Sequence, residues 1–435
     1  MVAIFQAGRA FADNPLILDQ FTADPTARAF DGRIYLYPSH DIVPPPGRAR
    51  GFCMEDYHAF SSENLLDWQD HGVIVAQTEV PWVNPSYRMW APDCVTKNGK
   101  YYFYFPAPPK AGAGGGRGGG WGIGVAVADK PGGPFKPQEK PIAGANGIDP
   151  CVLMDKDGQG YLFYSLNAIF VAKLKDNMVE LETPPQKIPD LPTQGLVEGP
   201  FAFERNGKYY LSFPHATKTE RLEYAMAESP MGPYKMTGVI MDESASGCWT
   251  NHHSLVQYKD QWYLFYHDMD LSATDTNRSV HADYLTFNDD GTINKVIPTL
   301  RGVGIADARR KIQIDRYSAI SKQGAKVSFL DEARKSDGWK ASLSEKDAFV
   351  QYDRVDFGKG ALKSAVIRAV SSAGGTVEIH LDRPEGPIVA KIEISKGADW
   401  SVVKAALIAV PTETHNLAVT MPGNGDVDID WVSFE

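Results

Sequence analysis

The feature that most constrains the fold is a repeat in the first two thirds of the chain. Five segments end in an aromatic run typical of a strand, and four of the five begin with Asn-Gly or Asp-Gly; they are residues 31–37, 98–104, 157–163, 206–212 and 259–265. These dipeptides suit the type I′ turns of β-hairpins. Their shared tyrosines, at positions 35, 102, 161, 210 and 263, are 67, 59, 49 and 53 residues apart. Such spacing is about that of one four-stranded propeller blade, so the repeat predicts a five-bladed β-propeller.

The last third of the chain has a different pattern. Short strand-like segments separated by turn residues follow one another there, at residues 349–355, 365–370, 376–381, 388–394, 417–420 and 428–434. This pattern is typical of a β-sandwich, or jelly roll, of ordinary domain size. The basic stretch Ala308–Lys311 marks the connector. The predicted organisation is therefore all-β, with a propeller over residues 1–308 and a sandwich over residues 309–435.

Composition excludes several classes of function. The net charge of −10 argues against a nucleic-acid partner, which requires a basic surface. The sequence contains no run of about eighteen apolar residues, so it predicts no membrane-spanning helix. The first residues lack the basic and apolar regions of a signal peptide, so the expected compartment stays open: secreted or periplasmic if a leader was removed, and otherwise cytoplasmic. Oligomeric state is equally open.

The cysteines and the glycine-rich segment carry little chemistry. Four widely spaced cysteines, without a Cys-x-x-Cys pair, predict buried thiols and neither a metal cluster nor a disulfide framework. Residues 107–120 are rich in glycine but lack the Gly-Lys-Ser/Thr of a phosphate-binding loop. We expect a mobile loop beside the functional site.

Counting back from each repeat tyrosine locates the start of each blade. The equivalent positions, 11 or 12 residues earlier, are Asp24, Trp90, Asp149, Glu198 and His252. Because the innermost strands of a propeller line its axis, these five side chains are expected to meet in one pocket. A single Asp-Pro is weak support, since Asp is common in turns. Three carboxylates at equivalent positions, with a Trp to stack on a sugar, are much stronger.

Clustered carboxylates suit glycoside hydrolysis. One carboxyl group with a raised pKa protonates the departing glycosidic oxygen, and an ionised one activates water or attacks the anomeric carbon. A third carboxylate nearby keeps the acid protonated through like-charge repulsion. A Ser-His-Asp hydrolase is not supported, because no Gly-x-Ser-x-Gly motif is present.

The chain resembles glycoside hydrolase family 43, whose members are five-bladed propellers, over about residues 10–305. The segments that carry this resemblance are residues 14–17, 23–25, 35–41, 90–93, 147–150, 197–201 and 251–254. It implies an inverting enzyme with Asp24 as general base, Glu198 as general acid, and Asp149 tuning the pKa and orientation of the acid. Inversion requires acid and base roughly 6.5–9.5 Å apart.

The same resemblance implies further site residues. Arg278 is expected to contact sugar hydroxyls, Trp90 to flank the sugar, and Ile148 to bind substrate beside Asp149. His40 and Asp41 are weaker candidates for the pocket rim. For Arg278 the alternative is a surface arginine on a loop, and for Trp90 it is core packing.

No cofactor is expected for the chemistry, but the resemblance implies calcium at two places. A His at the position of His252 lies near a calcium ion in the central channel of the family; the alternative is a buried imidazole with ordinary partners. Zinc is not expected, because no three ligands have suitable spacing. The C-terminal third resembles family 6 carbohydrate-binding modules, which implies a structural calcium at Asp315 and Asp430. Gln313 replaces one usual acidic ligand, and Asp428 stands where a sugar-binding Asn is typical, so we expect the fold of the module more firmly than sugar binding.

The predicted function is release of terminal β-D-xylosyl or α-L-arabinofuranosyl units from xylan or arabinan of plant cell walls. The motifs do not separate the two sugars. Two alternatives remain at this point: a lectin-like propeller that binds sugar without hydrolysis, and an endo-acting arabinanase. The presence of all three carboxylates argues against the lectin, because binding alone does not require the pair Asp24 and Glu198.

Overall fold

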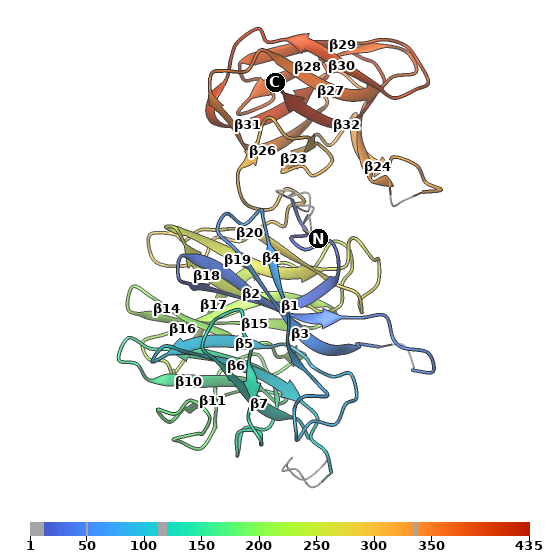
Figure 1. The fold of residues 1–435 in the computed structure, drawn as a ribbon. Helices are drawn as coiled ribbons and strands as arrows, with labels where there is room; N and C mark the ends of the chain where they lie inside the picture. Colours follow the sequence, from blue (N-terminus) through green and yellow to red (C-terminus); the bar gives the residue numbers. More distant parts are fainter. Residues whose placement is uncertain (1–12, 49–50, 112–119, 335–336) are drawn as a thin grey trace. The chain divides into compact units, whose positions relative to one another are not determined.

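The computed structural model describes residues 13–48, 51–111, 120–334 and 337–435, and these residues contain strands but no α-helix (Figure 1). None of them forms a helix with the length and apolarity needed to cross a membrane. The predicted glycine-rich loop falls largely on residues 112–119, outside the described residues. Chain contacts divide the structure into two compact units, which are considered separately.

Five antiparallel sheets follow one another along residues 15–298, which confirms the five-bladed propeller. The first contains β1 (Phe21–Phe30), β2 (Arg33–Asp41), β3 (Met54–Ser62) and β4 (Gln69–Ala76). The second contains β5 (Asp93–Lys97), β6 (Lys100–Ala107), β7 (Gly122–Ala128) and β8 (Lys136–Pro137). The third contains β9 (Ile148–Met154), β10 (Gly160–Ser165), β11 (Ile169–Lys173) and β12 (Gln186–Lys187). The fourth contains β13 (Leu196–Val197), β14 (Phe201–Arg205), β15 (Lys208–Ala216), β16 (Glu220–Ala227) and β17 (Lys235–Met241); the fifth contains β18 (His253–Tyr258), β19 (Gln261–Asp268) and β20 (Ser279–Leu285).

Three of the four Asn-Gly and Asp-Gly dipeptides form the predicted tight turns, whereas Asp157-Gly158 lies in a five-residue loop between the paired residues Met154 and Gly160. Both residues of Asp31-Gly32, Asn98-Gly99 and Asn206-Gly207 have positive φ, between 49° and 79°. The flanking pairs Phe30↔Arg33, Lys97↔Lys100 and Arg205↔Lys208 leave two residues in each turn. This geometry is that of type I′ hairpins, in which the turn twist matches the strand twist.

The innermost strands form a ring. Neighbouring blades contact through β1 and β5, β5 and β9, β9 and β14, β14 and β18, and finally β18 and β1. The N-terminal segment also pairs with the last blade, where Leu16 N–H donates to Val280 O at 2.8 Å and Thr22 N–H to Arg278 O at 2.8 Å. The first and last blades are therefore joined, as a closed propeller requires.

A polar cluster at the inner strands links four of the blades. Arg28 of β1 donates from Nε and Nη2 to both oxygens of Asp93 of β5, at 3.0 and 2.7 Å. Asp93 Oδ2 also accepts from Val152 N–H of β9 at 2.6 Å, and the guanidinium lies 4.7 Å from the ring centroid of Phe201 of β14. Asp93 is fully buried, so these charge-assisted bonds form away from water.

Two mainly antiparallel sheets make up the second unit, which confirms the sandwich. One contains β21 (Ala306–Asp307), β23 (Ala319–Ile320), β26 (Phe349–Lys359), β28 (Gly375–Leu381), β29 (Ile388–Ile394) and β31 (Thr412–Thr420). The other contains β22 (Ile312–Gln313), β24 (Ala325–Phe329), β25 (Trp339–Leu343), β27 (Ser364–Val370), β30 (Ser401–Ala406) and β32 (Val427–Phe434). The six strand-like segments of the sequence correspond to β26, β27, β28, β29, β31 and β32, and they do not include β21, β22, β23, β24, β25 and β30.

The structure divides the chain earlier than the predicted boundary at residue 308. Residues 299–435 belong to the sandwich unit, and so do the first described residues, 13 and 14. Asn14 N–H donates to Leu300 O at 3.0 Å, and Tyr352 Oη donates to Asp13 Oδ1 at 2.6 Å. The basic connector Ala308–Lys311 thus lies within the second unit. All four cysteines are buried and free, as expected.

Candidate active site

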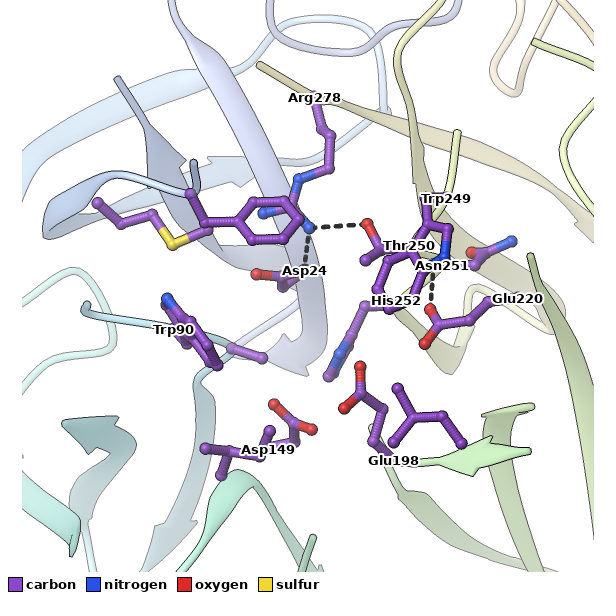
Figure 2. Close-up of a pocket in the computed structure, with 15 residues that line it drawn as sticks. Asp24, Trp90, Asp149, Glu198, Glu220, Trp249, Thr250, Asn251, His252 and Arg278 are labelled. Atoms are coloured by element: carbon purple, nitrogen blue, oxygen red, sulfur yellow. Dashed lines mark hydrogen bonds and ion pairs between the residues drawn. The ribbon is translucent and has the colours of Figure 1, made fainter. Parts of the chain in front are cut away.

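A pocket of about 210 Å³ lies where the inner strands of the five blades begin (Figure 2). Its lining consists of Asp24, Phe52, Met54, Trp90, Ala91, Ile148, Asp149, Leu196, Glu198, Glu220, Trp249, Thr250, Asn251, His252 and Arg278. The five side chains that the repeat predicts to converge are all in this set. Arg278 and Ile148 join them. Asp41 lies behind Arg278, and His40 is not part of the lining; its ring contacts Asp56 and His58.

Each of the three predicted carboxylates occupies a break in an inner strand. The register of β1 shifts between Ala23 and Thr26, and that of β9 shifts where Ile148 and Cys151 pair with β10. In the fourth blade the break separates β13 from β14. A proline follows each acid by one or two residues, and because proline has no N–H it cannot continue the ladder.

The backbone at these breaks is strained. Asp24 has φ 46°, Asp149 has φ 55°, and Gly199, directly after Glu198, has φ 53°. Positive φ is rare for residues with a side chain and clusters at functional sites. At Gly199 a Cβ would also lie 2.9 Å from Pro214 Cδ and 3.0 Å from His252 Nδ1, so glycine is required there. The breaks turn the three carboxylates out of the sheet and into the pocket.

Asp24 is held as a carboxylate by Arg278. Arg278 Nη1 donates to Asp24 Oδ1 at 2.9 Å. Burial alone would raise the pKa of Asp24, but the Arg278 charge lowers this pKa to about 2. Asp24 is therefore ionised throughout the neutral and mildly acidic range, as a general base must be.

Asp41 fixes the orientation of Arg278. Arg278 Nε and Nη2 donate to Asp41 Oδ2 and Oδ1 at 2.9 and 3.0 Å, and the Arg278 backbone N–H donates to Asp41 Oδ2 at 2.9 Å. Arg278 Nη1 also donates to Thr250 Oγ1 at 3.2 Å. Four of the five guanidinium N–H groups thus have partners, which leaves one for a sugar hydroxyl. The principal role of Arg278 in this geometry is to hold Asp24.

A buried histidine supports Asp24 from the other side. His267 Nδ1 accepts the Asp24 backbone N–H at 3.0 Å, so the ring proton is on Nε2, which donates to Thr250 O at 3.0 Å. Burial, together with the Arg278 charge, holds the pKa of His267 well below its usual range. The neutral ring fixes the strained Asp24 backbone without competing for its carboxylate.

Glu198 and Asp149 form the acidic side of the pocket. Burial raises the pKa of Glu198 and raises that of Asp149 well above its usual range, and the Glu198 charge raises the pKa of Asp149 further. The backbone N–H of Gly199 donates to Asp149 Oδ2 at 3.0 Å. This bond fixes the peptide that follows Glu198 relative to Asp149. The pKa of Glu198 is thus raised, while that of Asp24 in the same pocket is lowered.

A fourth carboxyl group, Glu220, lines the pocket and was not predicted. Glu220 begins β16, so counting from the repeat tyrosines does not reach it. Its Oε2 accepts the Asn251 backbone N–H at 2.5 Å, and its Oε1 is buried without a hydrogen-bond partner in the described structure. Burial and the Glu198 charge raise the pKa of Glu220 well above its usual range. The neighbouring Glu220 carboxyl group lowers the pKa of Glu198 against the effect of burial.

Aromatic side chains form the apolar wall of the pocket. The Trp90 ring lies 4.2 Å, centroid to centroid, from Trp121, and Phe52 covers the Arg278 guanidinium at 4.7 Å. Trp249 is 41% exposed, so its indole is available at the surface of the pocket. The faces of these rings suit the apolar faces of a sugar. Phe52 and Trp249 were not predicted, because neither lies at a repeat position.

His252 does not by itself make a calcium site. Calcium prefers six to eight oxygen ligands. Burial lowers the pKa of His252, so the imidazole is neutral, and the nearby Asp24 carboxylate is already bound to Arg278. Among the described residues, no group of three potential ligands includes His252. Water molecules would have to supply most of the ligands.

The second predicted calcium site has a mixed fit. Asp315 Oδ1 is buried without a hydrogen-bond partner in the described structure, and burial raises the pKa of Asp315 to about 6. A cation would satisfy this oxygen. Asp430, however, is paired with Arg368, and Asp315 Oδ2 lies 3.4 Å from Arg316 Nε. The two arginines already neutralise the pair, which reduces the need for a metal ion.

Asp428, which stands where a sugar-binding Asn is typical of the module, lies in a hollow of the sandwich. The hollow is lined by Gly324, Ala325, Lys326, Ser328, Lys340, Ser342, Ser344, Asp426 and Asp428. Asp428 accepts from Lys340 Nζ and, at 2.5 Å, from Ser342 Oγ. Both carboxylate oxygens therefore have partners within the sandwich.

Two carboxyl groups in one propeller pocket, with the pKa of Asp24 lowered and that of Glu198 raised, are the arrangement that a glycoside hydrolase requires. Comparison with protein families agrees. The model of glycosyl hydrolases family 43 matches residues 12–293, and the chain belongs to this family. The model of carbohydrate binding module family 6 matches residues 321–435.

Similar proteins cover mainly the propeller. Xylosidase/arabinosidase 43A of Humicola insolens is 36% identical over 331 residues, which are 64% of this chain and 98% of that protein. The xylosidase/arabinosidase of Bacteroides ovatus is 33% identical, over 64% of this chain and 95% of that protein. Among solved structures, a family 43 β-xylosidase/α-arabinofuranosidase from a compost metagenome, in complex with xylotriose, is 33% identical, with TM-score 0.60, over 66% of this chain and 98% of that chain. An arabinoxylan arabinofuranohydrolase from Bacillus subtilis, 24% identical with TM-score 0.57, covers 98% of this chain and shares its fold.

Proposed function

We propose that the protein is an exo-acting, inverting glycosidase that releases single β-D-xylosyl or α-L-arabinofuranosyl units from xylan or arabinan of plant cell walls. The observation that carries this proposal is the opposite shift of the pKa of two carboxyl groups in one pocket: the pKa of Asp24 is lowered to about 2, and that of Glu198 is raised. The printed names of the relatives, xylosidase and arabinosidase, support the choice of sugars.

In the proposed reaction, Glu198 gives its proton to the glycosidic oxygen as the bond to the anomeric carbon breaks. Asp24 takes a proton from a water molecule, whose oxygen forms the new bond to the opposite face of that carbon. The products are a free sugar of inverted configuration and the shortened chain. At the end of the cycle Asp24 is protonated and Glu198 ionised, and exchange with solvent restores both.

Two substitutions test the proposal. Glu198→Gln and Asp24→Asn should each lower the hydrolysis of aryl glycosides by at least about a thousandfold, because each removes an obligatory proton transfer. Circular dichroism and thermal unfolding would confirm that both variants fold. Near-normal turnover in either variant would contradict the assignment. The configuration of the first product, read by NMR before mutarotation, reports inversion directly.

A substrate comparison separates the remaining alternatives. Aryl β-D-xyloside and aryl α-L-arabinofuranoside should be cleaved with measurable preference for one sugar, and xylo-oligosaccharides should yield monosaccharide from the first minutes. Arabinan cleaved into oligosaccharides would indicate an endo-acting enzyme instead. Sugar binding without any turnover would indicate a lectin.

Calcium at the propeller centre and in the sandwich stays a prediction, and neither ion is needed in the proposed chemistry. The compost xylosidase/arabinofuranosidase was solved in a form described as calcium-free. At Asp315, the buried oxygen without a partner supports an ion more strongly than the single imidazole of His252 does. Titration of metal-stripped protein with Ca²⁺, in wild type and Asp315→Asn, would test the sandwich site.

A further inference from the structure

A cluster of histidine and aspartate side chains in the first blade has no role in the proposed reaction. His40 Nδ1 lies 2.7 Å from Asp56 Oδ1, and the rings of His40 and His58 are 5.2 Å apart at 72°. One potential ligand atom from each of these three residues lies within 4.8 Å of the other two. None of the three lines the catalytic pocket.

We propose that His40, Asp56 and His58 form a binding site for a divalent transition-metal ion of the zinc type. Two imidazole nitrogens and one carboxylate oxygen are the three protein ligands of many open zinc sites, in which water completes the shell. Calcium and magnesium favour oxygen ligands, so the two nitrogens select against them. The proposal is independent of the hydrolytic function.

Strand geometry explains why the ligands meet. Asp56 and His58 are two residues apart on β3, so their side chains lie on one face, while Tyr57 between them is buried on the other. His40 lies on the neighbouring strand β2, one residue beyond the pair Ser39↔Tyr57. Two adjacent strands therefore supply all three ligands, and no loop has to close to complete the set.

The surroundings suit a cation. His58 Nδ1 lies 3.0 Å from both oxygens of Asp70 on β4, which places a second carboxylate beside the site. Gln20 Nε2 donates to Asp70 at 3.4 Å, and Gln20 Oε1 is buried without a partner in the described structure. The side chains of His40, Asp56 and His58 are 14–20% exposed, so an ion can enter from solvent yet be largely enclosed.

In the metal-free protein each imidazole is hydrogen-bonded through Nδ1 to a carboxylate, an arrangement that a metal can replace. An ion that displaces the shared proton bonds to nitrogen at about 2.0–2.1 Å and to oxygen at about 2.0–2.2 Å. These bond lengths are compatible with the observed separation of His40 Nδ1 and Asp56 Oδ1 after a small adjustment. The ion would tie β2 to β3 next to Asp41, the residue that orients Arg278.

The test measures metal binding on the full chain, without reference to activity. Metal-stripped protein is titrated with Zn²⁺ against a chromogenic chelator, and with Co²⁺ while visible absorption reports four- or five-coordinate nitrogen-oxygen ligation. We expect one such ion per chain in wild type and a rise in Tm on adding Zn²⁺. His40→Ala and His58→Ala should each weaken that binding at least about tenfold.

A matched control is His415→Ala, which removes another His–Asp pair, with Asp382, that has no second histidine. This variant should bind Zn²⁺ as wild type does. If His58→Ala fails to fold, Asp56→Asn provides the same test with the smaller change. Equal Zn²⁺ stoichiometry and affinity in wild type and in the first-blade variants, or no Zn²⁺ bound by wild type at 100-fold excess, would overturn the proposal. Loss of binding in His252→Ala alone would do the same, because it would place the ion in the catalytic pocket.

Discussion

Arg278 holds Asp24 at 2.9 Å through Nη1 while both carboxylate oxygens of Asp41 bind its Nε and Nη2. Asp24, the proposed general base, is thus oriented by Arg278, which lies on neither of the strands that carry Asp24 and Asp41. Asp24 and Asp41 come from β1 and β2 of the first blade, and Arg278 directly precedes β20 of the last. The position of the base depends on the contact between the first and last blades.

Asp41→Asn should lower kcat/KM without changing the catalytic groups. The amide cannot accept both guanidinium nitrogens, so Arg278 loses its fixed orientation and Asp24 is misplaced. A displacement of about 1 Å can cost roughly a hundredfold in rate. Steady-state kinetics on an aryl glycoside would measure the loss. Asp129→Asn, which removes only the surface pair with Lys100, is the control and should leave kcat/KM unchanged.

Arg278→Met should move the acidic limb of the pH profile to higher pH. With the guanidinium removed, burial is the dominant effect on Asp24, and its pKa rises from about 2. Activity then falls at a pH where the wild type is still fully active, because the base is protonated. Arg278→Lys keeps a positive charge and should show the smaller shift. An unchanged acidic limb in the Met variant would show that Arg278 does not control the ionisation of Asp24.

Glu220→Met should move the alkaline limb to higher pH. The Glu220 carboxyl group lowers the pKa of Glu198, so its removal raises that pKa and keeps the proposed general acid protonated further into the alkaline range. Glu220→Gln retains a donor and should lie between wild type and Met. The profile of kcat/KM between pH 5 and 10 measures the shift. An alkaline limb that moves to lower pH would show that Glu220 raises the pKa of Glu198 instead of lowering it.

Asp13→Asn should remove part of the pH dependence of stability in the sandwich unit. Burial raises the pKa of Asp13 to about 7, against the effects of Arg301 and Tyr352. Since the folded-state pKa is raised, the neutral carboxyl stabilises the fold at low pH, and this contribution is lost as the pH rises from about 4 to about 7. Three pKa units correspond to about 4 kcal/mol as an upper limit. Urea unfolding at pH 4 and pH 8 should show a smaller difference in the variant than in wild type.

Much of the propeller and its pocket carboxylates could be predicted because short sequence motifs define each copy of the repeat. Asn-Gly turns specify the hairpins, and the acids at Asp24, Asp149 and Glu198 precede a proline that interrupts the inner strand. The position of a residue in the repeat therefore predicts whether its side chain lies at the propeller axis. The carbohydrate-module fold followed from short strands and turn residues in the same way.

What the sequence did not reveal depends on contacts across the fold. Glu220 and Trp249 lie off the repeat positions and reach the pocket from the start of β16 and from the segment before β18. His40 was expected at the pocket rim, but its strand directs it to the face that carries Asp56 and His58. Zinc was not expected because spacing was considered along the chain, whereas the ligands meet across two paired strands. The spacing of Asp56 and His58, two residues apart on one strand, was the one sequence feature that indicated two potential ligands on the same face.

The Arg28–Asp93 cluster has a consequence for how the enzyme loses activity when it unfolds. Each blade supplies a different part of the pocket, and the inner strands are joined to one another in a circle. In an open solenoid a terminal repeat can fray while the others keep working. In this ring, release of a single blade would remove a reacting or sugar-binding group and expose the buried guanidinium at the same time. Catalytic activity should thus be lost in one step with the propeller, with no partly active intermediate during unfolding.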